Sequence, residues 1–257
     1  MSDLPVLLPA APAPDPWAGL QAFTAARIAL GRSGTSVPLR AALAFRLAHA
    51  HARDAVYSAL AAEALLSGLR ALGVATGQVH SRARTREEYL QRPDWGRQLD
   101  EPSQARLDGM AADDCDVAVV LADGLSATAL NEHALPLLGL LLPQLQHAGR
   151  RLAPVVLAKQ ARVALGDEIG QRLRARLVLV LIGERPGLSA PDSLGAYFTF
   201  GPRPGLTDEA RNCVSNIRPA GLGYAPAADK LVFLLGEAFR LRLSGVGLKD
   251  ESGLLSA

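Results

Sequence analysis

The sequence predicts an α/β fold with a mostly parallel, Rossmann-like sheet that is flanked by helices and preceded by an N-terminal helical subdomain. Two segments, 116–122 and 177–182, are apolar almost throughout, which is typical of parallel strands buried on both faces. Between them, residues 130–145 repeat leucine and alanine at helical spacing. This alternation of strands and helices favours right-handed crossovers between parallel strands.

Three parts are predicted along the 257 residues. Residues 1–16 are rich in proline and predict an extended, flexible arm. Residues 17–72 form the predicted helical subdomain, with one helix after Pro38 and a second around 56–65. Residues 73–257 form the α/β domain. Its other predicted strands are 74–80, 154–157 and 194–200, and its other predicted helices are 86–99, broken by Pro93, then 165–173 and 227–243.

Composition excludes several classes of protein. The formal net charge is only +2, and the arginine-rich run 81–86 has no interleaved aromatics on which bases could stack, so no nucleic-acid site is predicted. Cys115 and Cys213 are far apart and form neither a disulfide framework nor a zinc motif. The N-terminal apolar run is short and interrupted by proline, so neither a signal peptide nor a membrane span is expected. A cytoplasmic protein is the expectation.

Two of the predicted strands end in glycine-containing polar loops. Segment 116–122 runs into Asp123-Gly124, and segment 177–182 runs into a loop that holds Glu184 and Arg185 between glycines. The carboxyl ends of parallel strands lie along one edge of a sheet, where open α/β proteins bind ligands. Ser126 or Thr128 is suited to cap the helix that follows. Ordinary turns between strands and helices explain the same residues, so the pattern leaves both interpretations open.

A third polar stretch, residues 211–218, is predicted to lie outside any helix or strand. Taken alone it reads as a structured loop with a half-buried Cys213. A nucleophilic role for this cysteine is the weaker interpretation, because no histidine follows it in the sequence.

The usual catalytic and phosphate-binding motifs are absent from the sequence. It contains no GxxxxGK[ST], no GxGxxG and no HExxH, and His133 is interpreted as a solvated or hydrogen-bonded helix residue rather than a metal ligand. No pair of carboxylates stands out as an acid/base couple. The residues alone therefore indicate an α/β protein with a ligand-binding edge and no complete catalytic set.

Six short strings, in order along the chain, resemble the small subunit of ethanolamine ammonia-lyase. Together they extend over nearly all of the chain beyond the proline-rich arm. They are 27–34, 85–90, 92–97, 123–126, 183–188 and 213–218.

The resemblance implies a subunit of an adenosylcobalamin-dependent carbon–nitrogen lyase that converts ethanolamine to acetaldehyde and ammonia. It implies a hetero-oligomer in which a large TIM-barrel subunit carries the substrate site, while this chain closes over the cofactor and is inactive alone. Cobalamin is expected base-on, and the Asp-x-His-x-x-Gly pattern of base-off proteins is missing here. The cofactor contacts of the family fall on Val163, Glu184 and Cys213. Asp123, Arg185 and Asn216 are neighbours suited to support this site or to contact the large subunit.

Alternatives of other classes remain at this point. One is a stand-alone hydrolase or transferase that uses Cys213 or Glu184, and another is a non-catalytic scaffold whose polar loops only contact a partner. The chain departs from some family members at its N-terminus, where a longer extension is linked to packaging in a bacterial microcompartment. The arm here is short, so a plain cytoplasmic complex and an encapsulated one both remain open.

Overall fold

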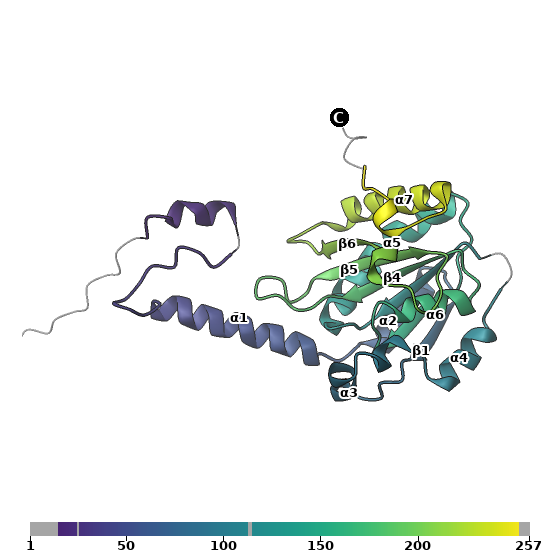
Figure 1. The fold of residues 1–257 in the computed structure, drawn as a ribbon, viewed down its shortest axis with the longest axis horizontal. Helices are drawn as coiled ribbons and strands as arrows, with labels where there is room; N and C mark the ends of the chain where they lie inside the picture. Colours follow the sequence, from purple (N-terminus) through teal and green to yellow (C-terminus); the bar gives the residue numbers. More distant parts are fainter. Residues whose placement is uncertain (1–14, 25, 113–114, 252–257) are drawn as a thin grey trace, which may run out of the picture.

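The computed structural model describes residues 15–24, 26–112 and 115–251. Its centre is one six-stranded sheet with the strand order β1-β3-β2-β4-β5-β6 (Figure 1). The strands are β1 (Thr76–His80), β2 (Val117–Ala122), β3 (Val155–Lys159), β4 (Leu177–Gly183), β5 (Leu194–Phe200) and β6 (Asn212–Ile217). The pairs β1–β3, β3–β2 and β2–β4 are parallel, whereas β4–β5 and β5–β6 are antiparallel. The predicted α/β class and mostly parallel sheet are therefore confirmed.

Seven α-helices are present in the described part of the chain. They are α1 (Leu39–Tyr57), α2 (Ala62–Ala71), α3 (Arg86–Gln91), α4 (Glu101–Asp108), α5 (Ala127–His147), α6 (Leu165–Arg172) and α7 (Tyr224–Leu241). Short 3-10 helices occur at Ala18–Phe23, Trp95–Arg97, Asp208–Ala210 and Gly245–Gly247. Among the described residues, no helix is both long and apolar enough to cross a bilayer.

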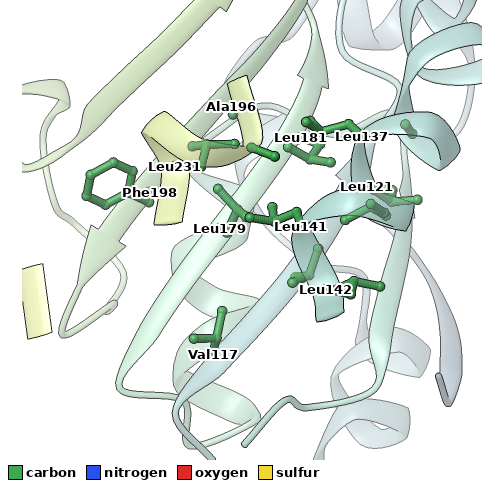
Figure 2. Close-up of a cluster of buried hydrophobic side chains, with 14 of the residues drawn as sticks. Val117, Leu121, Leu137, Leu141, Leu142, Leu179, Leu181, Ala196, Phe198 and Leu231 are labelled. Carbon is green, nitrogen blue, oxygen red and sulfur yellow. The ribbon is translucent and has the colours of Figure 1, made fainter. Parts of the chain in front are cut away.

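Helices cover both faces of the sheet because side chains on a strand alternate between its faces. Val117, Val119 and Leu121 of β2 pack in a core cluster with residues of α2, α5 and α7. Ala118 and Val120 belong to a second cluster on the opposite face, with residues of α4 and α6. Figure 2 shows part of the first cluster, where leucines of β2 and β4 lie against leucines of α5 and α7. A central strand buried on both faces explains why 117–122 contains no polar residue.

Sequence periodicity located most helices, but the helix predicted around 56–65 was misplaced, because α1 ends at Tyr57 and α2 begins only at Ala62. Ser126 caps α5 by accepting a hydrogen bond from the backbone N–H of Ala129 at 3.4 Å, so it and not Thr128 fills the predicted cap. The predicted helix 86–99 ends at Gln91, and a 3-10 turn follows Pro93. Helix α4 was missed, although Asp100 caps it and a proline stands in its first turn.

One prediction of an irregular segment was wrong. The polar stretch 211–218 contains β6, which pairs with β5 at the edge of the sheet. Only Val214 and Ile217 of this strand are buried, and the register shifts opposite Leu194 and Ala196, where β6 carries one residue more than β5. The irregularity breaks the alternation of apolar and polar residues that would have identified a strand.

The N-terminal region extends away from the sheet (Figure 1). Helix α1 and the residues before it project outward, whereas α2 contributes Leu65, Leu66 and Leu69 to the core. The proline-rich arm predicted for 1–16 lies outside the described residues except for Asp15 and Pro16. The three-part division at residues 16 and 72 stays a prediction.

Candidate functional site

The two glycine-containing loops meet at the carboxyl edge of the sheet, as their sequence predicts. β2 and β4 are direct parallel neighbours, and the backbone N–H of Leu125 donates to the carbonyl of Gly183 at 2.9 Å. Gly124 has φ +58°, and a Cβ built on it would lie 2.2 Å from the Gly183 oxygen. Glycine is therefore required at 124 both for its backbone conformation and for the close approach of the two loops.

Asp123 fixes a third loop, the one that follows β3. Its two carboxylate oxygens accept hydrogen bonds from the backbone N–H groups of Gln160 at 2.8 Å and Ala161 at 3.0 Å. The side chain is buried, and desolvation raises its pKa above the usual range. Asp123 therefore holds the backbone that presents Arg162 and Val163 and is not itself exposed to a ligand.

Helix α3 closes one side of this region through an aromatic–arginine cluster. The guanidinium carbons of Arg162 and Arg86 lie 4.2 and 4.7 Å from the centroid of the Tyr89 ring. Arg86 also donates to the carbonyl of Gly124 at 2.8 Å, and Arg162 donates to the carbonyl of Tyr89 at 3.1 Å. Burial raises the pKa of Tyr89 to about 12, so its hydroxyl stays protonated.

A cavity of about 370 Å³ opens where these loops converge. Val163 and Glu184 both lie in its wall, although they are 21 positions apart in the sequence. Its lining comprises Tyr89, Leu125, Arg162, Val163, Ile182, Gly183, Glu184, Arg185 and Tyr197. Cys213 does not line it, but it is the cross-strand neighbour and hydrogen-bond partner of Tyr197, which does. The structure thus places two of the predicted residues in the cavity and the third directly behind its wall.

The carboxylate of Glu184 is oriented from one side only. Its Oε2 accepts a hydrogen bond from the Ser193 hydroxyl, and its backbone N–H donates to the Ser193 carbonyl at 3.0 Å. The side chain lies against Gly195, where a Cβ would come within 2.8 Å of Oε1. In the part of the chain that the structure describes, Oε1 receives no hydrogen bond. Glu184 therefore offers a fixed, free acceptor at the cavity.

Cys213 is a thiol rather than a thiolate at neutral pH. Although the residue is exposed at the edge strand, desolvation of its sulfur beside Tyr197 and Glu184 raises its pKa to about 11. Nucleophilic cysteines need the opposite shift, which a neighbouring cation or helix N-terminus provides. The ionisable groups acting on this thiol are a phenol and a carboxylate, so the geometry does not support covalent catalysis by Cys213.

This pKa shift predicts slow alkylation of Cys213. At pH 8 its rate with iodoacetamide should be about 100-fold below that of an unperturbed cysteine, because a pKa raised by about two units leaves that much less thiolate. The rate should keep rising up to about pH 11 instead of levelling near pH 9. Mass spectrometry of the Cys115→Ser variant would follow Cys213 alone, since Cys115 is the other cysteine of the chain. A plateau near pH 9 would contradict the assignment.

Of the two remaining neighbours that the sequence suggested, one lines the cavity and the other does not. Arg185 is exposed and lines the cavity, whereas Asn216 lies on β6 and accepts a hydrogen bond from Arg218 at 3.0 Å. Sequence analysis missed Arg162 and Tyr197 as cavity residues. Arg162 adjoins Val163, and Tyr197 lies on a strand whose pairing partner was not predicted, so only the cross-strand register reveals it.

His133 is a hydrogen-bonded helix residue, as interpreted from the sequence. It is buried in α5 with its Nδ1 2.9 Å from the Tyr224 hydroxyl and its Nε2 3.4 Å from Asp192. Arg218 donates to the other oxygen of Asp192 at 3.0 Å. These bonds connect α5 and α7 to the end of the loop that bears Glu184.

A larger hollow lies elsewhere in the described chain. It is open, measures about 1290 Å³, and is lined from the segments 81–104, 164–168 and 204–206. None of the three predicted contact residues lines it, and its arginines alternate with carboxylates such as Glu88 and Glu168. The convergence of loops from β2, β3 and β4 makes the smaller cavity the better candidate site.

Comparison with known proteins identifies the family. The family model for ethanolamine ammonia-lyase light chain matches residues 14–249. An ethanolamine ammonia-lyase small subunit of Ralstonia nicotianae is 55% identical over 95% of this chain and 92% of its own length. Those of Azotobacter vinelandii and Pseudomonas aeruginosa are 56% and 54% identical over 93% and 95% of this chain, and 89% and 91% of their own lengths. The chain therefore belongs to the ethanolamine ammonia-lyase light-chain family, whose members are subunits of a carbon–nitrogen lyase.

Proposed function

We propose that this chain is the cofactor-binding small subunit of an adenosylcobalamin-dependent lyase that converts ethanolamine to acetaldehyde and ammonia. Its partner is a large TIM-barrel subunit that carries the substrate site. Cobalamin is bound base-on between the two subunits, and Val163, Glu184 and Cys213 lie on this chain's side of it. When bound, the cofactor supplies the radical that starts the reaction. The residues of this chain bind and orient it.

The free Oε1 of Glu184 at the cavity is the observation that carries this proposal. A corrin ring has amide groups along its rim, and a carboxylate fixed by Ser193 is a suitable acceptor for one of their N–H donors. Val163, in the wall of the same cavity, offers an apolar contact. Cys213 supports the wall through Tyr197, so its contribution is a small polarisable group beside the cavity.

The lining also fits a base-on cofactor. Among the described residues, the nine that line the cavity include no histidine, and a cobalamin that keeps its own dimethylbenzimidazole on cobalt needs none. At about 370 Å³ the cavity is near the lower end of the range for small-molecule sites, and cobalamin is much larger. This chain can thus surround only part of the cofactor, which supports a pocket shared with a second subunit.

Of the two alternatives, a stand-alone hydrolase or transferase fits less well. A hydrolase or transferase would need an activated nucleophile, but the pKa of Cys213 is raised and Glu184 is paired with a serine rather than with a base.

Purifying the chain with and without the large subunit tests the proposed function directly. Cobalamin-dependent release of ammonia from ethanolamine should require both proteins, and activity of the chain alone without cobalamin would reject the proposal.

Glu184→Ala should weaken cobalamin binding by the assembled complex. Loss of a hydrogen bond to a charged acceptor costs about 1–3 kcal/mol, so the Kd should rise about 5- to 150-fold. Equilibrium dialysis against cobalamin would measure it. Glu63→Ala removes an exposed carboxylate from α2 and should leave the Kd unchanged. An unchanged Kd for Glu184→Ala in an intact complex would contradict the assigned contact.

The proposal also covers the type of sheet and the division of the chain into parts. The sheet is Rossmann-like in binding its ligand at the carboxyl ends of parallel strands, residues 17–72 act as a helical subdomain, and 73–257 contact cobalamin. The complex is cytoplasmic, and its packaging in a microcompartment would depend on partners of the N-terminal arm.

A further inference from the structure

Most of the exposed apolar surface of this chain is concentrated in its N-terminal projection, which we define as residues 15–24 and 26–57. Eleven of the fifteen large hydrophobic side chains that are exposed in the described chain belong to it. They are Trp17, Leu20, Phe23, Ile28, Leu30, Val37, Leu39, Leu43, Phe45, Leu47 and Tyr57. Scattered exposed leucines are ordinary in soluble proteins, whereas a contiguous apolar element marks an interaction surface.

Helix α1 is the main part of this surface. Leu39, Leu43 and Leu47 follow one another at intervals of four residues, so they form one row along the helix, and they are 73%, 52% and 58% exposed. Of the 19 residues of α1, only Ala55 is buried. A helix gains most of its stability in a protein from packing an apolar face, and nothing in the described chain covers this one.

The base of the projection is nevertheless held firmly. Arg86 donates to the carbonyl of Val56 at 2.7 Å, and the hydroxyl of Ser58 accepts from the backbone N–H of Thr128 at 3.0 Å. The side-chain amide of Asn131 bonds both the carbonyl of Ala59 and the N–H of Ala61, at 3.0 and 2.9 Å. These bonds fix the direction in which α1 leaves the body of the protein, so α1 projects in a defined orientation (Figure 1).

The projection leaves from the same edge of the sheet as the candidate cofactor site. Arg86, which holds its base, also bonds Gly124 in the loop after β2. Further along, Arg27 donates to the carbonyl of Leu188 at 3.1 Å, in the loop that bears Glu184. The apolar surface is therefore continuous with the edge that the proposed function assigns to the large subunit.

The charges of the projection are mostly positive. Its exposed arginines include Arg32, Arg40, Arg46 and Arg53, whereas its carboxylates are Asp15, which accepts from the N–H of Trp17, and Asp54, which lies 4.0 Å from Arg53. A surface of leucine and phenylalanine bordered by arginines complements an apolar groove with an acidic rim.

From these observations we propose that the N-terminal projection docks in an apolar groove with an acidic rim on the large subunit, the same subunit that shares the cofactor. This rests on the proposed function only in naming the partner. The contact forms without cobalamin, because none of the cavity residues belongs to the projection. The projection is thus an assembly element, separate from the cofactor contacts of Val163 and Glu184.

The double variant Leu43→Glu/Leu47→Glu tests this proposal. Both subunits are co-purified at full length without added cobalamin, and dissociation of the complex on dilution is followed by mass photometry. The Kd between the subunits should rise about 100-fold or more, because two buried apolar contacts are replaced by charges facing an acidic rim. Val246→Glu is the matched control. Val246 is 71% exposed on the body of the protein, and its replacement should leave the Kd unchanged.

A second variant tests the same docking proposal if the first fails to fold. Arg40→Glu/Arg46→Glu should raise the Kd about 10-fold or more at low salt, with a smaller effect at high salt. An unchanged Kd for a folded leucine variant would overturn the proposal. So would a self-association of the small subunit that the leucine variant abolishes while the heteromeric complex persists, because the groove would then belong to a second copy. Neither outcome bears on cobalamin affinity, which the Glu184 variant measures.

Discussion

Gly183→Ala should lower the free energy of unfolding by about 3 kcal/mol or more. A Cβ on residue 183 would lie 1.9 Å from the carbonyl oxygen of Ser126 and 2.9 Å from that of Asp123. Both neighbours are backbone atoms of the turn between β2 and α5, so neither can rotate away as a side chain would. The end of β4 would have to separate from that turn, and the loop bearing Glu184 would move with it. Chemical denaturation followed by circular dichroism would measure the loss.

Gly187→Ala is the control for this prediction. It lies four residues further along the same loop, where a Cβ would be 3.7 Å from the nearest atom, the carbonyl oxygen of Ala190. Its unfolding free energy should be unchanged or higher by up to about 1 kcal/mol, since alanine restricts the unfolded chain. If Gly183→Ala were as stable as Gly187→Ala, the close contact between the two loops would be wrong.

The sequence predicts the centre of this fold well, because the centre obeys simple periodicities. Strands β2 and β4 are buried on both faces, so their apolar runs are unbroken, and the cap of α5 is a serine directly before the helical repeat. The parallel pairing of β2 and β4 then brings Asp123 and Glu184 to one edge without any further information.

The parts that could not be predicted depend on contacts between distant segments. The edge strand β6 has an irregular register, so its sequence shows no alternation, and the position of Cys213 behind Tyr197 follows only from that register. Tyr89 joins the cavity because Arg86 and Arg162 come together over its ring across 76 residues of chain. Periodicity also identified α1 as a helix, but it did not reveal that this helix would lack a partner within its own chain.

Asp167→Ala should be among the most destabilising single substitutions in this chain. Asp167 of α6 and Arg211, directly before β6, form an ion pair whose side chains are 2% and 3% exposed. Arg211 also donates to the carbonyl of Leu206 at 3.1 Å, and Thr199 is a further hydrogen-bond partner of Asp167. Removing the carboxylate leaves the buried guanidinium with only the solvent-exposed carboxylate of Asp208 as counter-charge, and breaking a buried pair in this way typically costs about 3–5 kcal/mol. Because Cys213 stands two residues after Arg211, the edge strand beside the candidate cavity should loosen as well.

Asp208→Ala is the control, because it removes a carboxylate that pairs with the same arginine but is exposed rather than buried. Asp208 pairs with the same arginine at 3.0 Å, but its side chain is 98% exposed, so its removal should leave the midpoint of chemical denaturation unchanged. The combined variant Asp167→Leu/Arg211→Met should recover much of the stability lost by Asp167→Ala, since a desolvated ion pair contributes little net free energy relative to apolar side chains of similar volume. If Asp167→Ala and Asp208→Ala unfolded at the same denaturant concentration, the pair would have to be solvated, and α6 could not be what fixes β6 at the edge of the sheet.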